Sequence, residues 1–421
     1  MKNNSVFKRS YLLISSLSPY PLFKTVASLG GLLSRRSRTA VGFIAALAGM
    51  LVVPSIAPAC PFCTAVKPSL SQQCDVAAIV AFAECLEATD SRQSFRLLKA
   101  PKGGELLKSK TSLELTRTSL ADPVSTPTIE TGSLALLLAK RDELSAEREL
   151  RWTEIPLNET SYAYVARAPS LRKPAAKRLA YFIPYLEHRD PLLAEDAYLE
   201  FGHARYDEVA AVADKLPMDA MRRWLEDDRV PQARKGFYGL ALGLSRDEPE
   251  RRRNAEFLKQ QILKPASDFR AGFDGTLGGY LMAAGEPALE LIEKKYLADP
   301  RAASGDVRHA MTALRFYHEY GREIPAERLA RALRKLLVRQ EFAAAAIVDL
   351  ARWQDWESSK TVIALCQGES LKDASIRRSA ISYLLLCPTE QAARETARLR
   401  QLYPKEAADA EKRLNLNESG K

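Results

Sequence analysis

The cysteines are the residues of this chain whose types and spacing point most directly to chemistry. Four of the six lie close together, and the other two, Cys366 and Cys387, lie far along the chain. The tetrapeptide Cys60-Pro61-Phe62-Cys63 has the Cys-x-x-Cys spacing of thiol–disulfide enzymes, zinc sites and haem-attachment sites. Haem attachment requires a histidine directly after the second cysteine, and Thr64 stands there instead. Of the three roles, thiol–disulfide redox chemistry and metal binding therefore remain possible for this motif.

The surroundings of the motif favour structural disulfides. A redox thiolate of this kind needs a helix N-terminus that follows a buried strand, whereas the residues before Cys60 form a leader. A zinc site completed by Cys74 and Cys85 stays open as an alternative, but we predict no metal and no cofactor. In an oxidising compartment an even number of cysteines favours disulfides. We expect Cys60 and Cys63 to pair with Cys74 and Cys85, with three connectivities between which the sequence does not choose.

The compartment follows from the N-terminal residues. Arg35, Arg36 and Arg38 precede an uncharged apolar run, Ala40 to Val53, and Ala57-Pro58-Ala59 fits the small-x-small cleavage pattern. We predict that residues 1–59 are a signal peptide, which makes the mature protein extracytoplasmic, either periplasmic or secreted. Two alternatives would bring the protein to a membrane: an uncleaved leader, which is long enough to span a bilayer, or a lipid on Cys60.

Removal of the leader changes the charge of the protein. The leader carries seven Lys and Arg residues and no acidic residue, so the net charge of +10 falls to about +3 once these seven are subtracted. Binding to nucleic acid draws its affinity from concentrated positive charge, which the mature chain does not offer. We therefore expect no nucleic-acid partner.

Residues 60–165 have the pattern of a small β domain. Short β-prone runs alternate with turn residues such as Pro101-Lys102-Gly103-Gly104. The predicted strands are Val76–Leu86, Ser94–Lys99, Thr111–Arg117, Ser133–Lys140 and Leu150–Ile155. Five strands joined by loops of this length favour a small barrel or sandwich.

Residues 166–421 have a helical period instead. One apolar stripe comprises Leu329, Ala332, Leu333, Leu336 and Leu337, which lie on one face of a helix. Comparable helices are predicted to begin near Pro191, Pro231, Gly272, Asp306, Glu341 and Ala374, at intervals of roughly 35–40 residues, the period of a helical repeat. A second, more charged helix follows each of them. The charged run Glu406–Arg413 would cover the end of such a stack.

Helix pairs at this period are typical of an α-solenoid, in which each pair buries its apolar face on its neighbours. The region resembles HEAT-type repeats. The β region resembles the netrin-like domain of tissue inhibitors of metalloproteinases, through an N-terminal cysteine and the sequence Cys74-Asp75-Val76-Ala77-Ala78. That resemblance implies a five-stranded OB barrel and a protease-inhibitor-like role. The spacing Cys-x-x-Cys departs from the Cys-x-Cys of that module, which puts an inhibitory N-terminus in doubt.

The whole layout resembles a family of secreted planctomycete proteins that begin with Cys-Pro-Phe-Cys after the signal peptide. The motifs shared with it include Gly236-Phe237-Tyr238-Gly239-Leu240, the stretch 275–280 and the stretch 349–356. This resemblance covers nearly the full chain and implies no activity.

No catalytic constellation is recognisable among the other polar residues. His318-Glu319 begins the zinc-protease motif His-Glu-x-x-His, but Arg322 occupies the position of the second histidine. His309 and His318 are nine residues apart and should lie on opposite faces of one helix. The glycine-rich stretch 272–279 follows a helix and lacks the Lys-Ser/Thr of a phosphate-binding loop. We interpret it as a turn followed by a close helix–helix contact.

Trp353 and Trp356, beside Arg352, form the most distinctive aromatic cluster. Two tryptophans three residues apart share a helix face, and Trp and Arg are frequent in interface hot spots. These three residues are our candidates for binding a partner protein, although such a pair more often closes the core at a helix end.

The predicted fold is α+β with two domains and mainly α: a small disulfide-stapled, five-stranded β barrel (60–165) and an α-solenoid of HEAT-like helix pairs (166–421). The predicted function is that of an exported, non-enzymatic protein-interaction scaffold. The alternative is an extracytoplasmic thiol–disulfide oxidoreductase that uses Cys60 and Cys63.

Overall fold

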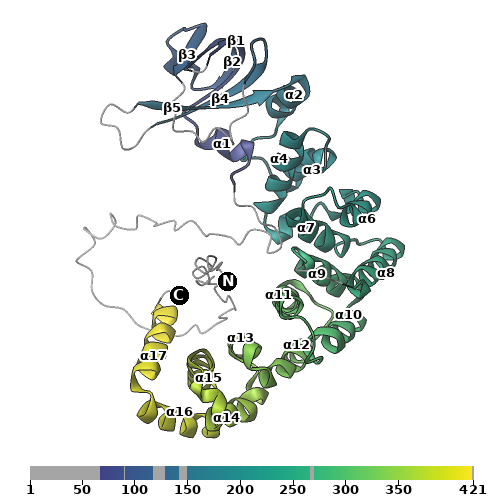
Figure 1. The fold of residues 1–421 in the computed structure, drawn as a ribbon, viewed down its shortest axis with the longest axis vertical. Coiled ribbons are helices and arrows are strands. Elements are labelled where there is room, and N and C mark those ends of the chain that lie inside the picture. The colour runs from purple at the N-terminus through teal and green to yellow at the C-terminus, as the bar shows by residue number, and fades with distance from the viewer. Residues whose placement is uncertain (1–66, 90, 117–128, 142–148, 266–269, 420–421) are drawn as a thin grey trace, which may run out of the picture.

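The computed structural model describes residues 67–89, 91–116, 129–141, 149–265 and 270–419, and the side chains of this part up to residue 414. The predicted signal peptide, Cys60 and Cys63 lie outside the described residues. The fold is mainly helical and contains a five-stranded antiparallel sheet. Figure 1 shows an arc, with the sheet at one end and α17 (Pro404–Ser419) at the other.

All five predicted strands are present. They are β1 (Ile79–Ala88), β2 (Arg92–Lys102), β3 (Ser112–Thr116), β4 (Leu134–Arg141) and β5 (Leu150–Leu157). Their order in the sheet is β3-β2-β1-β4-β5, and all described pairs are antiparallel. The strand β1 therefore lies in the middle, and β3 and β5 lie at the two edges.

The start of the first predicted strand is wrong. Val76 ends a helix, α1 (Leu70–Val76), instead of beginning β1. Ser69 caps this helix: its hydroxyl accepts from the Gln72 backbone, while the Gln72 side chain accepts from the Ser69 backbone. This reciprocal capping box satisfies two of the donors that a helix start leaves open, and it outweighs the β-prone residues that follow.

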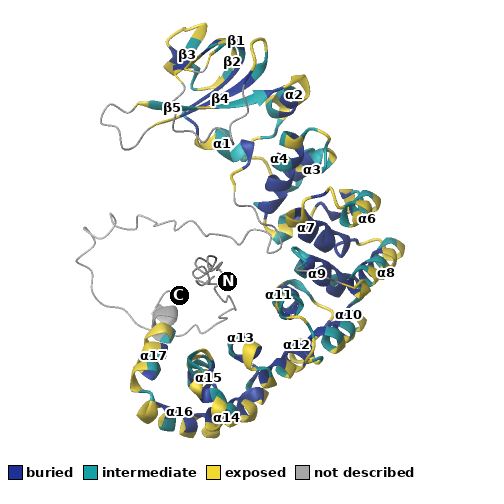
Figure 2. Cartoon of the chain, in the orientation of Figure 1, coloured by how far each residue is buried: buried dark blue, intermediate teal, exposed yellow. Residues whose placement is uncertain are grey.

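Both faces of the sheet are buried near β1. Along β1, Ile79, Ala81, Ala83 and Cys85 belong to one apolar cluster, whereas Val80 and Phe82 belong to another. The alternation follows the two-residue period of a strand. The second cluster also includes side chains from α1, α2 (Glu159–Arg167) and α4 (Pro191–Gly202), so these helices cover one face of the sheet (Figure 2).

The remaining helices form the rest of the arc. They are α3 (Ala175–Phe182), α5 (Tyr206–Ala210), α6 (Met218–Glu226), α7 (Gln232–Leu242), α8 (Glu248–Leu263), α9 (Phe273–Ala284), α10 (Glu286–Ile292), α11 (Ser304–Tyr320), α12 (Ala326–Leu333), α13 (Gln340–Arg352), α14 (Ser359–Gln367), α15 (Ala374–Leu386) and α16 (Glu390–Leu402). The six helix starts predicted from the sequence lie within two residues of observed starts.

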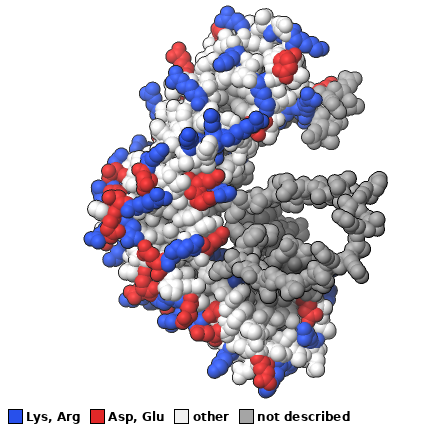
Figure 3. Space-filling model, turned by 180° about the vertical axis from the view of Figure 1, so that it is seen from behind, with Lys and Arg blue, Asp and Glu red and all other residues white. Residues whose placement is uncertain are grey.

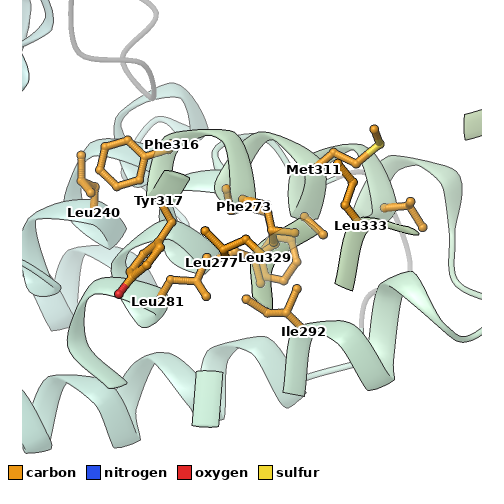
Figure 4. Packing of buried hydrophobic residues seen from close by; sticks show 14 of the residues in the cluster. Leu240, Phe273, Leu277, Leu281, Ile292, Met311, Phe316, Tyr317, Leu329 and Leu333 are labelled. Atoms are coloured by element: carbon orange, nitrogen blue, oxygen red, sulfur yellow. The ribbon is translucent and has the colours of Figure 1, made fainter. Parts of the chain in front are cut away.

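The helices from α6 onward lie in two rows. Figure 1 shows α7, α9, α11, α13 and α15 on the inner side of the arc and α8, α10, α12, α14 and α16 on the outer side. In the inner row α7 packs on α9, α9 on α11, and α13 on α15. Side chains from different helices of the inner row also belong to one apolar cluster. Figure 4 shows Leu240 of α7 beside Phe316 of α11, and Tyr317 of α11 beside Leu281 of α9.

The contact between α7 and α9 is made by main chains. Glycines with the same spacing on the two helices face each other. Gly236, Gly239 and Gly243, along α7 and at its end, face Gly272, Gly275 and Gly279, at the start of α9 and along it. A Cβ atom on Gly275 would lie 1.9 Å from the carbonyl oxygen of Gly236, a distance at which no side chain fits. The predicted close helix–helix contact of the glycine-rich stretch is confirmed.

The last helix has the polar outer face predicted for it. Ala407 and Ala410 of α17 are buried, and α17 packs on α15 and α16. Lys405, Lys412 and Arg413 are exposed. Among the described residues, no helix combines the length and apolar character that a membrane crossing requires.

Candidate functional site

The helix α1 joins the sheet to the helical part of the arc through hydrogen bonds at both of its ends. At its start, the Leu70 backbone donates to the Asp196 carboxylate of α4 (2.6 Å), and the Lys67 carbonyl accepts from Nε2 of His203 (2.8 Å). At its end, the Lys102 ammonium of β2 donates to the carbonyl of Cys74 (3.2 Å) and to that of Asp75. A cation at the carboxyl end of a helix also complements the helix dipole.

Asp196 is the central group of this junction. Its side chain is buried, with 3% of the residue exposed. One carboxylate oxygen accepts from Leu70, and the other accepts from the Tyr164 hydroxyl at 2.6 Å. Burial raises the pKa of Asp196 to about 6, and the carboxylates of Glu200 and Glu195 act in the same direction. Both donors are neutral, so they hold the carboxylate without neutralising its charge.

A second carboxylate lies one helical turn further along α4. Glu200 is 1% exposed and forms an ion pair with Arg178 of α3. Its other oxygen, Oε1, is buried and has no hydrogen-bond partner among the described residues. Tyr181 of α3 donates to the Tyr164 carbonyl at 2.8 Å. Burial is the main reason that the pKa of Tyr164 is raised, and the two carboxylates add to it. The network thus joins α2, α3 and α4.

A cleft of about 460 Å³ opens beside Asp196. Its walls come from the residues before and within α1, from the end of β5 and from α4. Leu70, Leu192 and Leu199 supply aliphatic surface, and Glu195 and Asp196 supply carboxylates. Glu195 also accepts a hydrogen bond from Arg234 of α7 at 2.9 Å.

The sequence analysis did not identify this site. Asp196 and Glu200 stand four residues apart within the mainly apolar stretch 191–201, whose one other charged residue is Glu195, so they share a helix face with buried residues. That spacing of two carboxylates on an apolar face is the feature that could have revealed the network.

The predicted disulfides involve Cys60 and Cys63, which lie outside the described residues, so they stay a prediction. Cys74 and Cys85 carry free thiols, as do Cys366 and Cys387. Cys85 lies fully buried inside the sheet and packs with the first apolar cluster of β1, whereas Cys74 packs with the second. The strand β1 separates the two thiols, which rules out a bond between them in this fold. The hydrogen bonds of α1 attach it to α4 and β2 without any disulfide.

The predicted tryptophan pair does not share a face. Trp353 stacks on His318 of α11, with ring centres 4.5 Å apart and planes within 6°. Trp356 packs edge-on against Tyr383 of α15 at 5.4 Å. The two rings diverge because α13 ends at Arg352 and Gln354 adopts a left-handed φ of 56°. Both tryptophans are half-buried and pack against the helical core near the end of α13.

Arg352, the third predicted partner-binding residue, is exposed at the end of α13. The stack of Trp353 on His318 lies directly beside it in the chain. Burial lowers the pKa of His318, which favours a neutral ring against the indole. The end of α13 therefore offers an aromatic stack and an exposed guanidinium together.

The histidines do not form a catalytic group in the described residues. As predicted, His309 and His318 point from opposite faces of α11: His309 lies 3.7 Å from the Asp274 carboxylate of α9, while His318 contacts α13. In the described part of the chain, no three His, Cys, Asp or Glu side chains are grouped so that they could hold a metal ion.

Comparisons of the chain with protein-family models, with curated proteins and with solved structures returned no match.

Proposed function

We propose that the protein is an exported, non-enzymatic interaction scaffold: a solenoid of HEAT-like helix pairs whose first end is covered by a small OB-type β domain. The observation that carries the proposal is the arc of helices in two rows, in which inner helices stack on one another from α7 to α11 and again from α13 to α15. Stacks of this kind present an extended surface to partners.

The sheet supports the OB interpretation. With β1 between β2 and β4, and with β3 and β5 at the edges, the described strands form a half-barrel that an edge-to-edge contact would close. The export interpretation depends on the charged and apolar pattern of residues 1–59 and on their predicted cleavage.

The interface that we assign to the scaffold is the end of α13. Trp353 is half-buried and rigidly stacked on His318, so binding would cost it little conformational entropy. Arg352 is exposed beside it, and the pair has the composition of an interface hot spot. Trp356 is assigned to the core, because it packs against Tyr383.

Acidic and basic side chains are interspersed over the face of the molecule seen in Figure 3. Such a surface provides no concentrated positive field for nucleic acid, which supports a protein partner.

The test is site-specific photo-crosslinking in the native host. A photoreactive residue is placed at position 352 of the full chain, and at position 252 on the outer helix α8 as a control. The protein that crosslinks only through position 352 is then purified, and its affinity for the scaffold is measured.

We expect Trp353→Ala and Arg352→Glu each to weaken that affinity by at least about tenfold, in the range of hot-spot substitutions. The control Arg252→Glu should leave it unchanged. Arg352→Glu changes only an exposed side chain, so it tests the interface even if Trp353→Ala destabilises the fold. Equal crosslinking from both positions, or an affinity that neither variant alters, would refute the proposed interface.

A further inference from the structure

The cleft beside Asp196 has the dimensions and the mixed lining of a ligand site. Its volume of about 460 Å³ lies within the range of roughly 300–1,000 Å³ that is typical of small-molecule sites. Aliphatic side chains of Leu192, Leu199 and Leu70 form much of its wall. The polar lining consists of Glu195 and Asp196 of α4, Glu154 of β5, Gln73 of α1 and Lys67 just before α1, so three carboxylates face one ammonium group.

The Asp196 carboxylate can accept more hydrogen bonds than the protein supplies. An ionised carboxylate offers about four acceptor positions, and the described donors, Leu70 N–H and the Tyr164 hydroxyl, occupy two of them. Arg178, the cation next to this network, is paired with Glu200. Neither donor to Asp196 carries a charge, so when the carboxylate is ionised its own hydrogen bonds do not neutralise it beside the cleft.

A buried carboxylate without a cation is unfavourable, and a cation placed against it is correspondingly favoured. Glu195, half-exposed at the same cleft and held by Arg234, adds to the negative potential there. A bare metal ion would make no use of apolar contacts with the aliphatic walls. A long basic side chain would, because it packs its methylene stem on apolar surface and places its charged head on polar groups.

We propose that this cleft binds a basic side chain of a partner peptide, with the cationic head on Asp196 and Glu195 and the aliphatic stem along Leu192 and Leu199. The site is formed by α1, β5 and α4, and it does not depend on the interface at Trp353. Its occupant is a lysine or arginine in a peptide chain.

The experiment uses the exported protein and a pair of matched probes. One probe is a short glycine peptide with a single arginine, and the other carries citrulline, which has the same shape without the charge. Binding is measured by isothermal titration calorimetry at about pH 6 and about pH 8, each in two buffers of different ionisation enthalpy. Free arginine methyl ester serves as a third probe, to separate a peptide from a small amine.

We expect the arginine peptide to bind at least about tenfold more tightly than the citrulline peptide, since only the former makes charge-assisted hydrogen bonds. Near pH 6, where the Asp196 carboxyl is partly protonated, binding should release protons, and near pH 8 it should release none. Asp196→Asn and Glu195→Gln should each weaken binding. The matched control Glu256→Gln, which removes one charge from the exposed surface of α8, should not.

Asp196→Asn keeps an oxygen to accept from Leu70 N–H, and its thermal unfolding reports whether the fold survives. If that variant is unfolded, Glu195→Gln decides the question. The proposal is overturned if citrulline and arginine bind alike, if Glu256→Gln has the effect of Glu195→Gln, or if neither peptide binds at millimolar concentration. If free arginine methyl ester binds as tightly as the arginine peptide, the site recognises a small amine and the proposed peptide partner is wrong.

Discussion

The carboxylate of Asp196 lies 2.6 Å from the backbone nitrogen of Leu70, a residue 126 positions earlier in the chain. Through this bond a helix that precedes the sheet is fastened to a helix that follows it. The same carboxylate accepts from Tyr164, so one buried acid joins α1, α2 and α4.

The stability of this junction should rise as the pH falls. Because burial raises the pKa of Asp196 from 3.8 to about 6, the folded state binds a proton more tightly than the unfolded state. Burying the ionised Asp196 carboxylate lowers the free energy of unfolding by an amount on the order of 2–3 kcal/mol. This loss of stability is complete above pH 6 and disappears as the pH falls toward 4 and the buried carboxyl takes up its proton. We expect Asp196→Asn, which cannot ionise, to remove this part of the pH dependence.

The measurement is urea unfolding of both proteins between about pH 4 and pH 8. Other carboxylates affect both proteins equally, so the difference between the two curves isolates Asp196. If the two curves run parallel over the whole range, the carboxyl is not perturbed as described.

Removing one partner of the Arg178–Glu200 ion pair should destabilise the protein far more than removing both charges. Both side chains are buried, with exposed fractions of 11% and 1%. Arg178→Met would leave the Glu200 charge buried without a cation, which typically costs about 3–5 kcal/mol. The double variant Arg178→Met with Glu200→Gln removes that charge, so we expect it to recover most of the loss. Urea unfolding checks this, and a double variant no more stable than Arg178→Met alone would contradict it.

The main-chain contact between α7 and α9 should tolerate no side chain. A Cβ atom on Gly275 would meet the Gly236 carbonyl at 1.9 Å, whereas a Cβ atom on Gly368 would lie 3.7 Å from its nearest neighbour, the Ala364 carbonyl. We expect Gly275→Ala to lower the free energy of unfolding by about 3 kcal/mol or more. Gly368→Ala, the matched control, should change it by less than about 1 kcal/mol. Similar losses for the two variants would show that the helices can separate freely.

The described thiols should be unreactive in the folded protein. Burial raises the pKa of Cys74 to about 11 and that of Cys366 to about 12, so at neutral pH almost no thiolate is present to react. We expect iodoacetamide to modify neither residue in native protein and both of them after unfolding in urea without reductant. Mass spectrometry of the alkylated peptides measures this. A requirement for reductant at Cys74 would show that it is oxidised in the exported protein, as the sequence analysis expected.

The elements that could be predicted from the sequence are those set by local pattern. The apolar period placed the start of α15 at Ala374, and the alternation of β-prone runs and turns placed β4 and β5 within two residues at every end. The start of β1 was missed because a local capping signal at Ser69 and Gln72 competed with β-prone residues. The glycine-rich start of α9 was interpreted correctly, because glycine destabilises a helix and is therefore expected there mainly where the absence of a Cβ atom permits a close main-chain contact.

The candidate site could not be predicted in the same way. Asp196 depends on Leu70 and Tyr164, and nothing in the local sequence of α4 indicates which distant groups it meets. The tryptophans were misplaced for a related reason. A helix period was assumed through Trp356, whereas the left-handed backbone of Gln354 turns the second ring toward another helix.

The glycine seam between α7 and α9 also determines where the arc can flex. Elsewhere in the inner row, neighbouring helices meet through side chains, which can slide or change rotamer as the arc opens or tightens. At the seam, carbonyl groups rest directly on the opposing α-carbons, so there is no compliant layer between the two helices. We therefore expect the segment from α7 to α9 to be the stiff section of the molecule, with changes in curvature taken up on either side of it.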